Sequence, residues 1–491
     1  MASNPKPKKT LIVGAFWSVG TRWAIKGIGF LNTVIMARLL VPADYGIVAM
    51  SMLVVGLLQA MMDFGAATAL LRKGEVSREE IDSAWTLRLL QCLVVAALML
   101  VLSPFAATYF TEPRVMTVLW ALAACVALGG LANIGLTLAQ KAFKFALDFR
   151  INVMAKTASV VATVVAGYVL RDYRALVIGI ATGYISGLVL SYVLHPYRPR
   201  WNTSKIGEIW AVTKWLMLAG VGTFLLRKSD EIVAARVGTT AEYGIYNVGS
   251  DLGRLPVSQL GPAMMRAFLP VLSSIQTDIQ RTNNAVLKTL SAANSITLPM
   301  GFGVAATALP LTVLILGDKW REAAPIVAVY AVVGSVQFAM SPLNTLLVLR
   351  GHTRTQSAVV WIEFTVFAVA SLVLVPYLHL IGLVWARLLA STVNAFVTAS
   401  SAQRYCGVRL SSVFGAFWRP LTGALGMYLL VSEVIARVPA GGMQLLAGVA
   451  SGVVAYTVWL SLSWVVMKRP EGIESTVMDL LVHRANRLAG K

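Results

Sequence analysis

The sequence predicts an all-α integral membrane protein. Three observations lead to this fold class: 57% of the 491 residues are hydrophobic, only 13% are charged, and the mean hydropathy is +0.72. Soluble domains carry about 25% charged residues. The apolar residues also fall into repeated runs of about 20, which is the length a helix needs to cross a bilayer core of about 30 Å. We therefore expect no separate soluble domain.

Fourteen apolar runs are expected to form transmembrane helices, joined by short connections rich in Pro, Gly and Asp. They cover residues 11–36, 46–70, 84–109, 115–139, 153–170, 175–194, 211–236, 243–269, 286–316, 323–349, 357–376, 380–402, 417–437 and 442–467.

The charges between these runs predict the orientation. With the N-terminus in the cytoplasm, 24 Lys and Arg residues fall on the cytoplasmic side and eight on the opposite side. Positive residues concentrate on the cytoplasmic side of membrane proteins. An even number of helices then places both termini in the cytoplasm.

A motif near residue 40 recurs 198 residues later without a gap. Five of ten positions are identical between residues 37–46 and 235–244, and Glu242 stands in place of Asp44. Each copy lies between the first and second helix of a set of six, so the sequence predicts parallel repeats about an axis along the membrane normal. The expected divisions are an N-terminal six-helix lobe at 1–205, a C-terminal six-helix lobe at 206–403, two additional transmembrane helices at 404–467 and a cytoplasmic tail at 468–491.

Several motifs resemble those of a known family. The segment from Arg38 to Met50, RLLVPADYGIVAM, resembles the opening signature of the polysaccharide transporter family, the Wzx-type flippase branch of the MATE-like MOP superfamily. Asp63-Phe64-Gly65 is similar to that family's Asp-Leu-Gly in helix 2, and the stretch from Leu316 to Trp320 looks like a further landmark. The resemblance covers essentially the whole chain.

This resemblance implies a fold of two six-helix lobes around a central cavity. It also implies a function. The protein would move undecaprenyl-pyrophosphate-linked oligosaccharide units from the inner to the outer leaflet by alternating access, for exopolysaccharide or lipopolysaccharide synthesis.

Basic residues inside the expected helices point to the cargo. A charge at a helix centre costs about 2.5–3.5 kcal/mol on insertion scales, so it normally faces the bundle interior or a watery cavity. The ten such residues are Arg22, Lys26, Arg88, Lys156, Lys214, Arg227, Lys228, Arg254, Arg266 and Arg387. Snorkelling is sufficient for Lys156, Lys214 and Arg266, which lie near cytoplasmic helix ends.

The other basic residues fall on polar stripes with helical spacing. On the first helix the stripe has steps of three and four and joins Ser18, Arg22, Lys26, Gly29 and Thr33. Arg22 and Lys26 have no acidic residue at helical spacing within this helix, which favours an aqueous cavity or an anionic cargo. Arginine grips phosphate with a rigid fork of donors and lysine acts as a point charge. We therefore predict a pyrophosphate headgroup site at Arg22, Lys26, Arg227, Arg254 and Arg387.

An alternative explanation for the stripes remains open. Polar stripes also hold membrane helices together, and Arg227–Glu231 and Asp251–Arg254 are candidate local ion pairs. Four intramembrane carboxylates are candidates for carrying a coupling H⁺ or Na⁺: Asp63, Asp230, Asp251 and Glu363. Asp63 has a competing packing or turn role beside Gly65, and Glu363 has a competing interfacial position.

Other functional classes fit less well. A MATE-type multidrug or other amphipathic-lipid exporter is the main alternative, but an exporter of cationic drugs would need an acidic cavity and the intramembrane surplus here is basic. A membrane enzyme would need a nucleophile–base pair or a metal set, and we expect no enzyme. Three scattered cysteines make neither a disulfide framework nor a metal site. We expect no metal and no cofactor beyond H⁺ or Na⁺ coupling.

The expected partners follow from the same observations. The basic residues are spread along the chain, which argues against nucleic acid. We expect a lipid-linked oligosaccharide, membrane lipids, and a polysaccharide polymerase with its export machinery as partners. The expected location is the bacterial cytoplasmic (inner) membrane, as a multi-pass protein.

Overall fold

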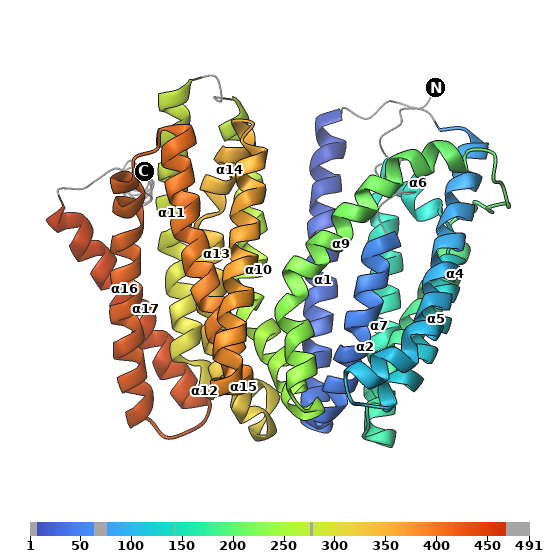
Figure 1. The fold of residues 1–491 in the computed structure, drawn as a ribbon, viewed down its shortest axis with the longest axis horizontal. Helices are drawn as coiled ribbons and strands as arrows, with labels where there is room; N and C mark the ends of the chain where they lie inside the picture. Colours follow the sequence, from blue (N-terminus) through green and yellow to red (C-terminus); the bar gives the residue numbers. More distant parts are fainter. Residues whose placement is uncertain (1–6, 63–75, 143, 275–277, 468–491) are drawn as a thin grey trace, which may run out of the picture. The chain divides into compact units, whose positions relative to one another are not determined.

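Helices are the only regular elements in the part of the chain that the computed structural model describes, which is residues 7–62, 76–142, 144–274 and 278–467 (Figure 1). The all-α class predicted from composition is confirmed. The first helices are α1 (Pro7–Leu39), α2 (Pro42–Met62), α4 (Arg78–Tyr109), α5 (Arg114–Gly130), α6 (Gly135–Lys141), α7 (Phe145–Leu170), α8 (Arg174–Val193) and α9 (Ile206–Val237).

The later helices continue this pattern to residue 466. They are α10 (Thr240–Ser274), α11 (Ile279–Ala306), α12 (Ala308–Leu316), the 3₁₀ helix η1 (Asp318–Ala323), α13 (Ala324–Ala339), α14 (Ser341–Leu349), α15 (Thr353–Cys406), α16 (Leu410–Arg437) and α17 (Gly442–Val466).

Seven helical segments within the described residues are long and apolar enough to cross a membrane, or nine if each of two bent pairs counts as one span. The expected number of fourteen is therefore not confirmed. One reason is that α15 contains two of the expected helices. His379 has φ 48° and ψ −134°, outside the helical region, so the chain breaks there. Pro376 lies three residues before the break and cannot donate a helical hydrogen bond.

Two of the expected helices prove to be bent. The run at 115–139 is divided into α5 and α6 with a bend of 57°. At this bend the Asn133 side chain accepts the backbone N–H of Gly135 (2.8 Å) and donates to the carbonyl of Tyr197 (2.5 Å). The run at 286–316 is divided into α11 and α12 with a bend of 71°. Pro310 explains this break, because its ring disfavours a helical carbonyl at Ala306, four residues earlier.

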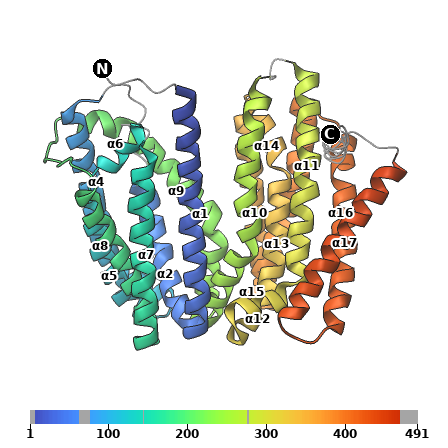
Figure 2. The ribbon, with the colours of Figure 1, turned by 180° about the vertical axis from the view of Figure 1, so that it is seen from behind.

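The chain divides into two compact units, Met1–Gly244 and Ile245–Lys491. In the first unit α1 runs along α7, α7 along α8, and α4 along α5 (Figure 2). In the second unit α11 packs against α13 and α16, and α16 packs against α17 (Figures 1 and 2). The four-part division expected from the sequence stays a prediction, and the expected tail at 468–491 lies outside the described residues.

The repeated motif forms the same local structure twice. Asp44 accepts a hydrogen bond from the backbone N–H of Val41 (3.2 Å), and Glu242 accepts one from Thr239 (2.8 Å). The two acids occupy equivalent repeat positions, and so do the two donors. A carboxylate near a helix N-terminus satisfies backbone donors that have no partner within the helix. The repeat therefore preserves the capping of α2 and α10.

Candidate substrate and coupling-ion sites

The basic stripe on α1 is exposed where the sequence predicts a cargo site. The side chains of Arg22 and Lys26 are both exposed. Arg22 has no acidic partner among the described residues. A guanidinium without a carboxylate partner keeps its donors available for an anionic ligand.

A third cation reaches this stripe from α7. A Cβ atom at Gly29 would lie 3.6 Å from Cε and 3.8 Å from Nζ of Lys156. The absent side chain at Gly29 therefore makes room for the lysine, three residues beyond Lys26. The ammonium of Lys156 thus lies close to α1, and snorkelling at a helix end stays a prediction for this residue. The sequence places Gly29 on this stripe, but nothing in the sequence links Gly29 to residue 156.

The polar residues of α9 divide into a buried acidic pair and an exposed cation. Asp230 and Glu231 are 0% and 1% exposed. Glu231 forms an ion pair with Lys228, three residues earlier, rather than with Arg227. Arg227 is exposed and has no partner among the residues that the structure describes. Arg227 is thus available to a ligand. The local ion pair that was considered as an alternative is formed by Lys228 instead.

Two further predicted site residues lie against aromatic rings in the second unit. The guanidinium carbon of Arg254 is 4.3 Å from the ring centre of Tyr330, whose hydroxyl is hydrogen-bonded to that of Tyr246. The guanidinium carbon of Arg387 is 5.6 Å from the ring centre of Phe367, and the buried Nε of Arg387 has no hydrogen-bond partner in the described part of the chain. Both guanidinium groups are close enough to these rings for a cation–π attraction.

The carboxylate of Glu363 links polar side chains of α13 and α15 in the second unit. It accepts a hydrogen bond from Nε2 of Gln337 on α13 (3.0 Å) and one from Nδ2 of Asn394 on the second half of α15 (2.7 Å). Thr398 continues the chain, with its hydroxyl 3.3 Å from Oδ1 of Asn394 and 3.4 Å from Oδ1 of Asn344. Glu363 is therefore the centre of a hydrogen-bond network.

The other coupling-ion candidates have different surroundings. Asp230 is buried on α9 and Asp251 is exposed on α10. Asp63 lies outside the described residues. No group of three or more His, Cys, Asp or Glu side chains in the described part of the chain is arranged to hold a metal ion. Of the four acids, Glu363 has the best-defined geometry for a switch.

The predicted residues fall into two sets. Arg22, Lys26 and Arg227 belong to the unit Met1–Gly244, and Arg254, Arg387 and Glu363 to the unit Ile245–Lys491. Within the second unit Glu363 links Gln337 on α13 with Asn394 on the second half of α15. The side chains of Lys214 and Arg266 are outside those that the structure describes.

Comparison with known proteins identifies relatives of the whole chain. Residues 35–325 match the family described as "Polysaccharide biosynthesis protein". The chain is 25% identical over 476 residues to the succinoglycan biosynthesis transport protein ExoT of Rhizobium meliloti (strain 1021), covering 93% of each chain. It is 22% identical over 349 residues to the lipopolysaccharide biosynthesis protein WzxC of Escherichia coli (strain K12), covering 70% of this chain and 71% of WzxC.

A solved structure shares the fold. The lipid II flippase MurJ, in an inward closed conformation, superposes with a TM-score of 0.68 at 14% identity, covering 93% of this chain and 100% of MurJ. At this identity the likeness concerns the fold alone. The resemblance to polysaccharide transporters that the sequence motifs indicated is confirmed.

Proposed function

The chain belongs to the polysaccharide biosynthesis protein family, and on that premise we propose that it is a flippase for lipid-linked oligosaccharide units. The observation that carries this proposal is the cationic stripe on α1, where Arg22 and Lys26 are exposed and Lys156 lies beside Gly29. Positive charge inside a membrane protein is costly unless a counter-charge or water compensates it. An anionic cargo that passes the stripe supplies a counter-charge to Arg22, which has no acidic partner among the described residues.

The chemistry of the stripe suits a pyrophosphate. The guanidinium of Arg22 can bind two phosphate oxygens through parallel N–H donors, and Lys26 and Lys156 add point charges that tolerate movement. Arg227, Arg254 and Arg387 are the further headgroup residues of this proposal. The undecaprenyl chain remains in lipid, where its apolar surface needs no protein cavity.

Net transport requires a conformational cycle, which we attribute to alternating access coupled to H⁺ or Na⁺. Glu363 is the principal candidate for the coupling residue. As a carboxylate it accepts one amide hydrogen bond from α13 and one from α15. Protonation converts one oxygen from acceptor to donor, so one amide must turn or separate. Binding of a proton to Glu363 therefore changes the hydrogen bonds between α13 and α15.

The cellular setting follows from the same proposal. The protein resides in the bacterial inner membrane with both termini in the cytoplasm, in agreement with the distribution of Lys and Arg. It receives its cargo on the cytoplasmic face and releases it to a polysaccharide polymerase and export machinery. The protein moves the oligosaccharide without making or breaking a covalent bond in it, so it is not an enzyme.

The experiment compares lipid-linked repeat units on the two membrane faces in a deletion strain. Wild type, an Arg22→Gln/Lys26→Gln variant and an Arg150→Gln control are each returned to this strain. Arg150 is an exposed arginine of α7 outside the proposed site. We expect the deletion strain to accumulate repeat units on the cytoplasmic face. Strains that carry wild type or the control should have about ten-fold fewer repeat units on this face than the strain that carries the double variant.

Two results would count against the proposal. Normal outward delivery in the deletion strain, with no redundant transporter present, would exclude the flippase function and favour an exporter of other amphipathic molecules. Full rescue by the double variant, at equal protein level in the membrane, would retain the flippase and remove the α1 stripe as the headgroup site.

A further inference from the structure

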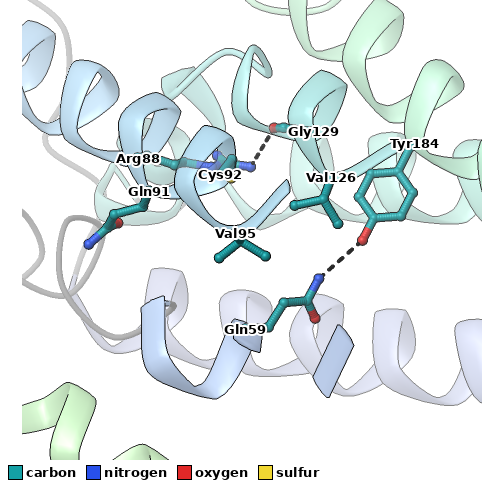
Figure 3. A pocket seen from close by; sticks show the side chains of 8 residues that line it. All are labelled: Gln59, Arg88, Gln91, Cys92, Val95, Val126, Gly129 and Tyr184. Carbon is teal, nitrogen blue, oxygen red and sulfur yellow. Dashed lines mark hydrogen bonds between the residues drawn. The ribbon is translucent and has the colours of Figure 1, made fainter. Parts of the chain in front are cut away.

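A small polar cavity lies within the first unit, among α2, α4, α5 and α8 (Figure 3). Its volume is about 200 Å³. Pockets for drug-sized ligands measure about 300–1,000 Å³. The cavity is thus too small for an oligosaccharide and is of a size for a single acidic group or sugar ring.

Three neighbouring residues of α4 supply one wall. Arg88, Gln91 and Cys92 are three and four residues apart, which places them on one face of the helix (Figure 3). Arg88 donates one hydrogen bond, from Nη2 to the carbonyl of Gly129 (3.2 Å). A guanidinium has five N–H donors, so this single bond leaves most of them available.

A buried donor without a partner points to a ligand. Gln91 is 8% exposed, and its Nε2 has no hydrogen-bond partner among the described residues. A buried polar group that lacks a partner costs about 1–3 kcal/mol. On the opposite wall the Nε2 of Gln59 donates to the hydroxyl of Tyr184 (3.3 Å), so two more polar groups border the cavity (Figure 3).

The charge of the lining determines the sign of the ligand. Arg88 is charged, and none of the described residues that line the cavity is a carboxylate. A cation in such a position attracts an anion with little competition from water. An oxyanion in the cavity accepts hydrogen bonds from Arg88, whose remaining donors the described residues leave open.

We propose that this cavity binds a carboxylate carried on a sugar of the transported oligosaccharide, and so selects acidic repeat units. This proposal rests on the proposed flippase function and adds a site for the sugar portion of the cargo. Arg88 binds the carboxylate, while Gln59 and Tyr184 exchange hydrogen bonds with ring hydroxyls. Arg88 was recognised in the sequence only as one of ten intramembrane cations, because spacing does not reveal a cavity shared by four helices.

Cys92 provides a reporter inside the cavity. It is partly exposed, while Cys125 and Cys406 are buried. The full chain, in lipid nanodiscs, is treated with an anionic methanethiosulfonate (sulfonatoethyl) or a cationic one (trimethylammonioethyl), and modification of Cys92 is followed by mass spectrometry. We expect the anionic reagent to react about ten-fold faster, because a cationic cleft concentrates anions. D-Glucuronate should slow this reaction, and D-glucose should not.

Variants assign the effect to Arg88. Arg88→Gln should remove the preference for the anionic reagent and the protection by glucuronate, whereas Arg88→Lys should retain the preference. Arg150→Gln is the matched control and should behave as wild type. Size-exclusion profiles check that each variant is folded, and Arg88→Lys keeps the test decisive if Arg88→Gln does not fold.

Three outcomes would overturn the proposal. They are equal rates for the two reagents, no modification of Cys92 by either, or protection by inorganic phosphate without protection by glucuronate. The last result would assign the cavity to a phosphate group instead of an acidic sugar. None of them bears on the proposed flippase function, which the accumulation of repeat units in the deletion strain tests separately.

Discussion

Gly46 and Gly244, which occupy equivalent positions in the two copies of the repeat, each pack against the turn of the other copy. A Cβ atom at Gly46 would lie 1.9 Å from the carbonyl oxygen of Thr240, and one at Gly244 would lie 2.0 Å from that of Pro42. Pro42 and Thr240 are themselves equivalent, 198 residues apart. The two contacts are therefore reciprocal, as a local two-fold relation between parallel repeats requires.

Substitution of either glycine by alanine should destabilise the protein. In an unobstructed helix, glycine to alanine stabilises by about 1 kcal/mol. At Gly46 and Gly244 the new methyl group meets backbone, which cannot rotate away, so we expect a loss of about 1–3 kcal/mol. Thermal unfolding of detergent-purified Gly46→Ala and Gly244→Ala, monitored by size-exclusion chromatography, measures this loss.

Gly27→Ala is the matched control for this prediction. Gly27 also lies in a helix, but a Cβ atom there would meet nothing within 4 Å. This variant should be as stable as wild type or more so. If Gly46→Ala and Gly27→Ala have the same unfolding temperature, the turns do not pack as closely as we describe.

Loss of the ion pair between Lys228 and Glu231 should lower the free energy of unfolding far more than loss of an exposed pair of similar geometry. Glu231 is 1% exposed, so Lys228→Met leaves a buried carboxylate without this partner. Removal of one member of a buried pair costs about 3–5 kcal/mol. The measurement is the unfolding temperature of the purified variant.

Arg437→Met supplies the comparison for the buried pair. Nη2 of Arg437 lies 2.6 Å from Oε1 of Glu433, and the two side chains are 77% and 63% exposed. Exposed pairs contribute about 0–1 kcal/mol, so this change should have little effect. Equal effects of the two substitutions would show that burial of Glu231 does not strengthen its dependence on Lys228.

The same pair illustrates where prediction from sequence stops. The sequence predicts that the α9 charges share a face, but Glu231 is three residues from Lys228 and four from Arg227. Both spacings bring side chains together on a helix. Only the packed structure shows that Lys228 is the partner and that Arg227 remains available.

Long-range relations were harder to predict than local ones. The helical class, the break near Pro376 and the capping acids Asp44 and Glu242 depend on neighbouring residues, and the sequence carries their signals. Periodicity identifies a polar face but not the helix opposite it. The contacts of Lys156 with Gly29 and of Arg88 with Gly129 each join two helices, so the sequence alone gave no indication of them.

The connection after α8 should be sensitive to mild acid through His195. Its Nδ1 accepts the backbone N–H of Tyr197 (3.2 Å), and a Cβ at Gly135 would lie only 2.1 Å from this nitrogen. Burial, and then the charges of Lys144 and Arg198, hold the pKa of His195 below its usual 6.5. The folded state therefore favours neutral His195. Stability should be highest above pH 6.5 and should fall as the pH drops through the lowered pKa.

This pH dependence is tested by unfolding temperatures at pH 5.5 and 7.5. His195→Asn keeps an acceptor near the position of Nδ1 but cannot take up a proton. Wild type should lose more stability than the variant on acidification. If both lose the same amount, other groups cause the acid sensitivity and His195 does not contribute.

Glu363→Gln should slow transport and make the remaining rate independent of the coupling-ion gradient. Glutamine resembles the protonated acid, with one oxygen that accepts and one group that donates, so it fixes one state of the contact with Gln337 and Asn394. We expect outward delivery of repeat units to fall, because glutamine cannot take up or release the coupling proton. The residual rate should no longer respond when the proton or sodium gradient is collapsed.

Glu433→Gln makes the same chemical change at an exposed acid of α16 and should leave both rate and gradient dependence unchanged. The unfolding temperatures of the two variants distinguish a coupling role from a packing role. A purely structural Glu363 would lower stability while leaving the gradient dependence of the remaining transport intact. Wild-type transport and wild-type gradient dependence in Glu363→Gln would move the coupling site to one of the other acids, beginning with the buried Asp230.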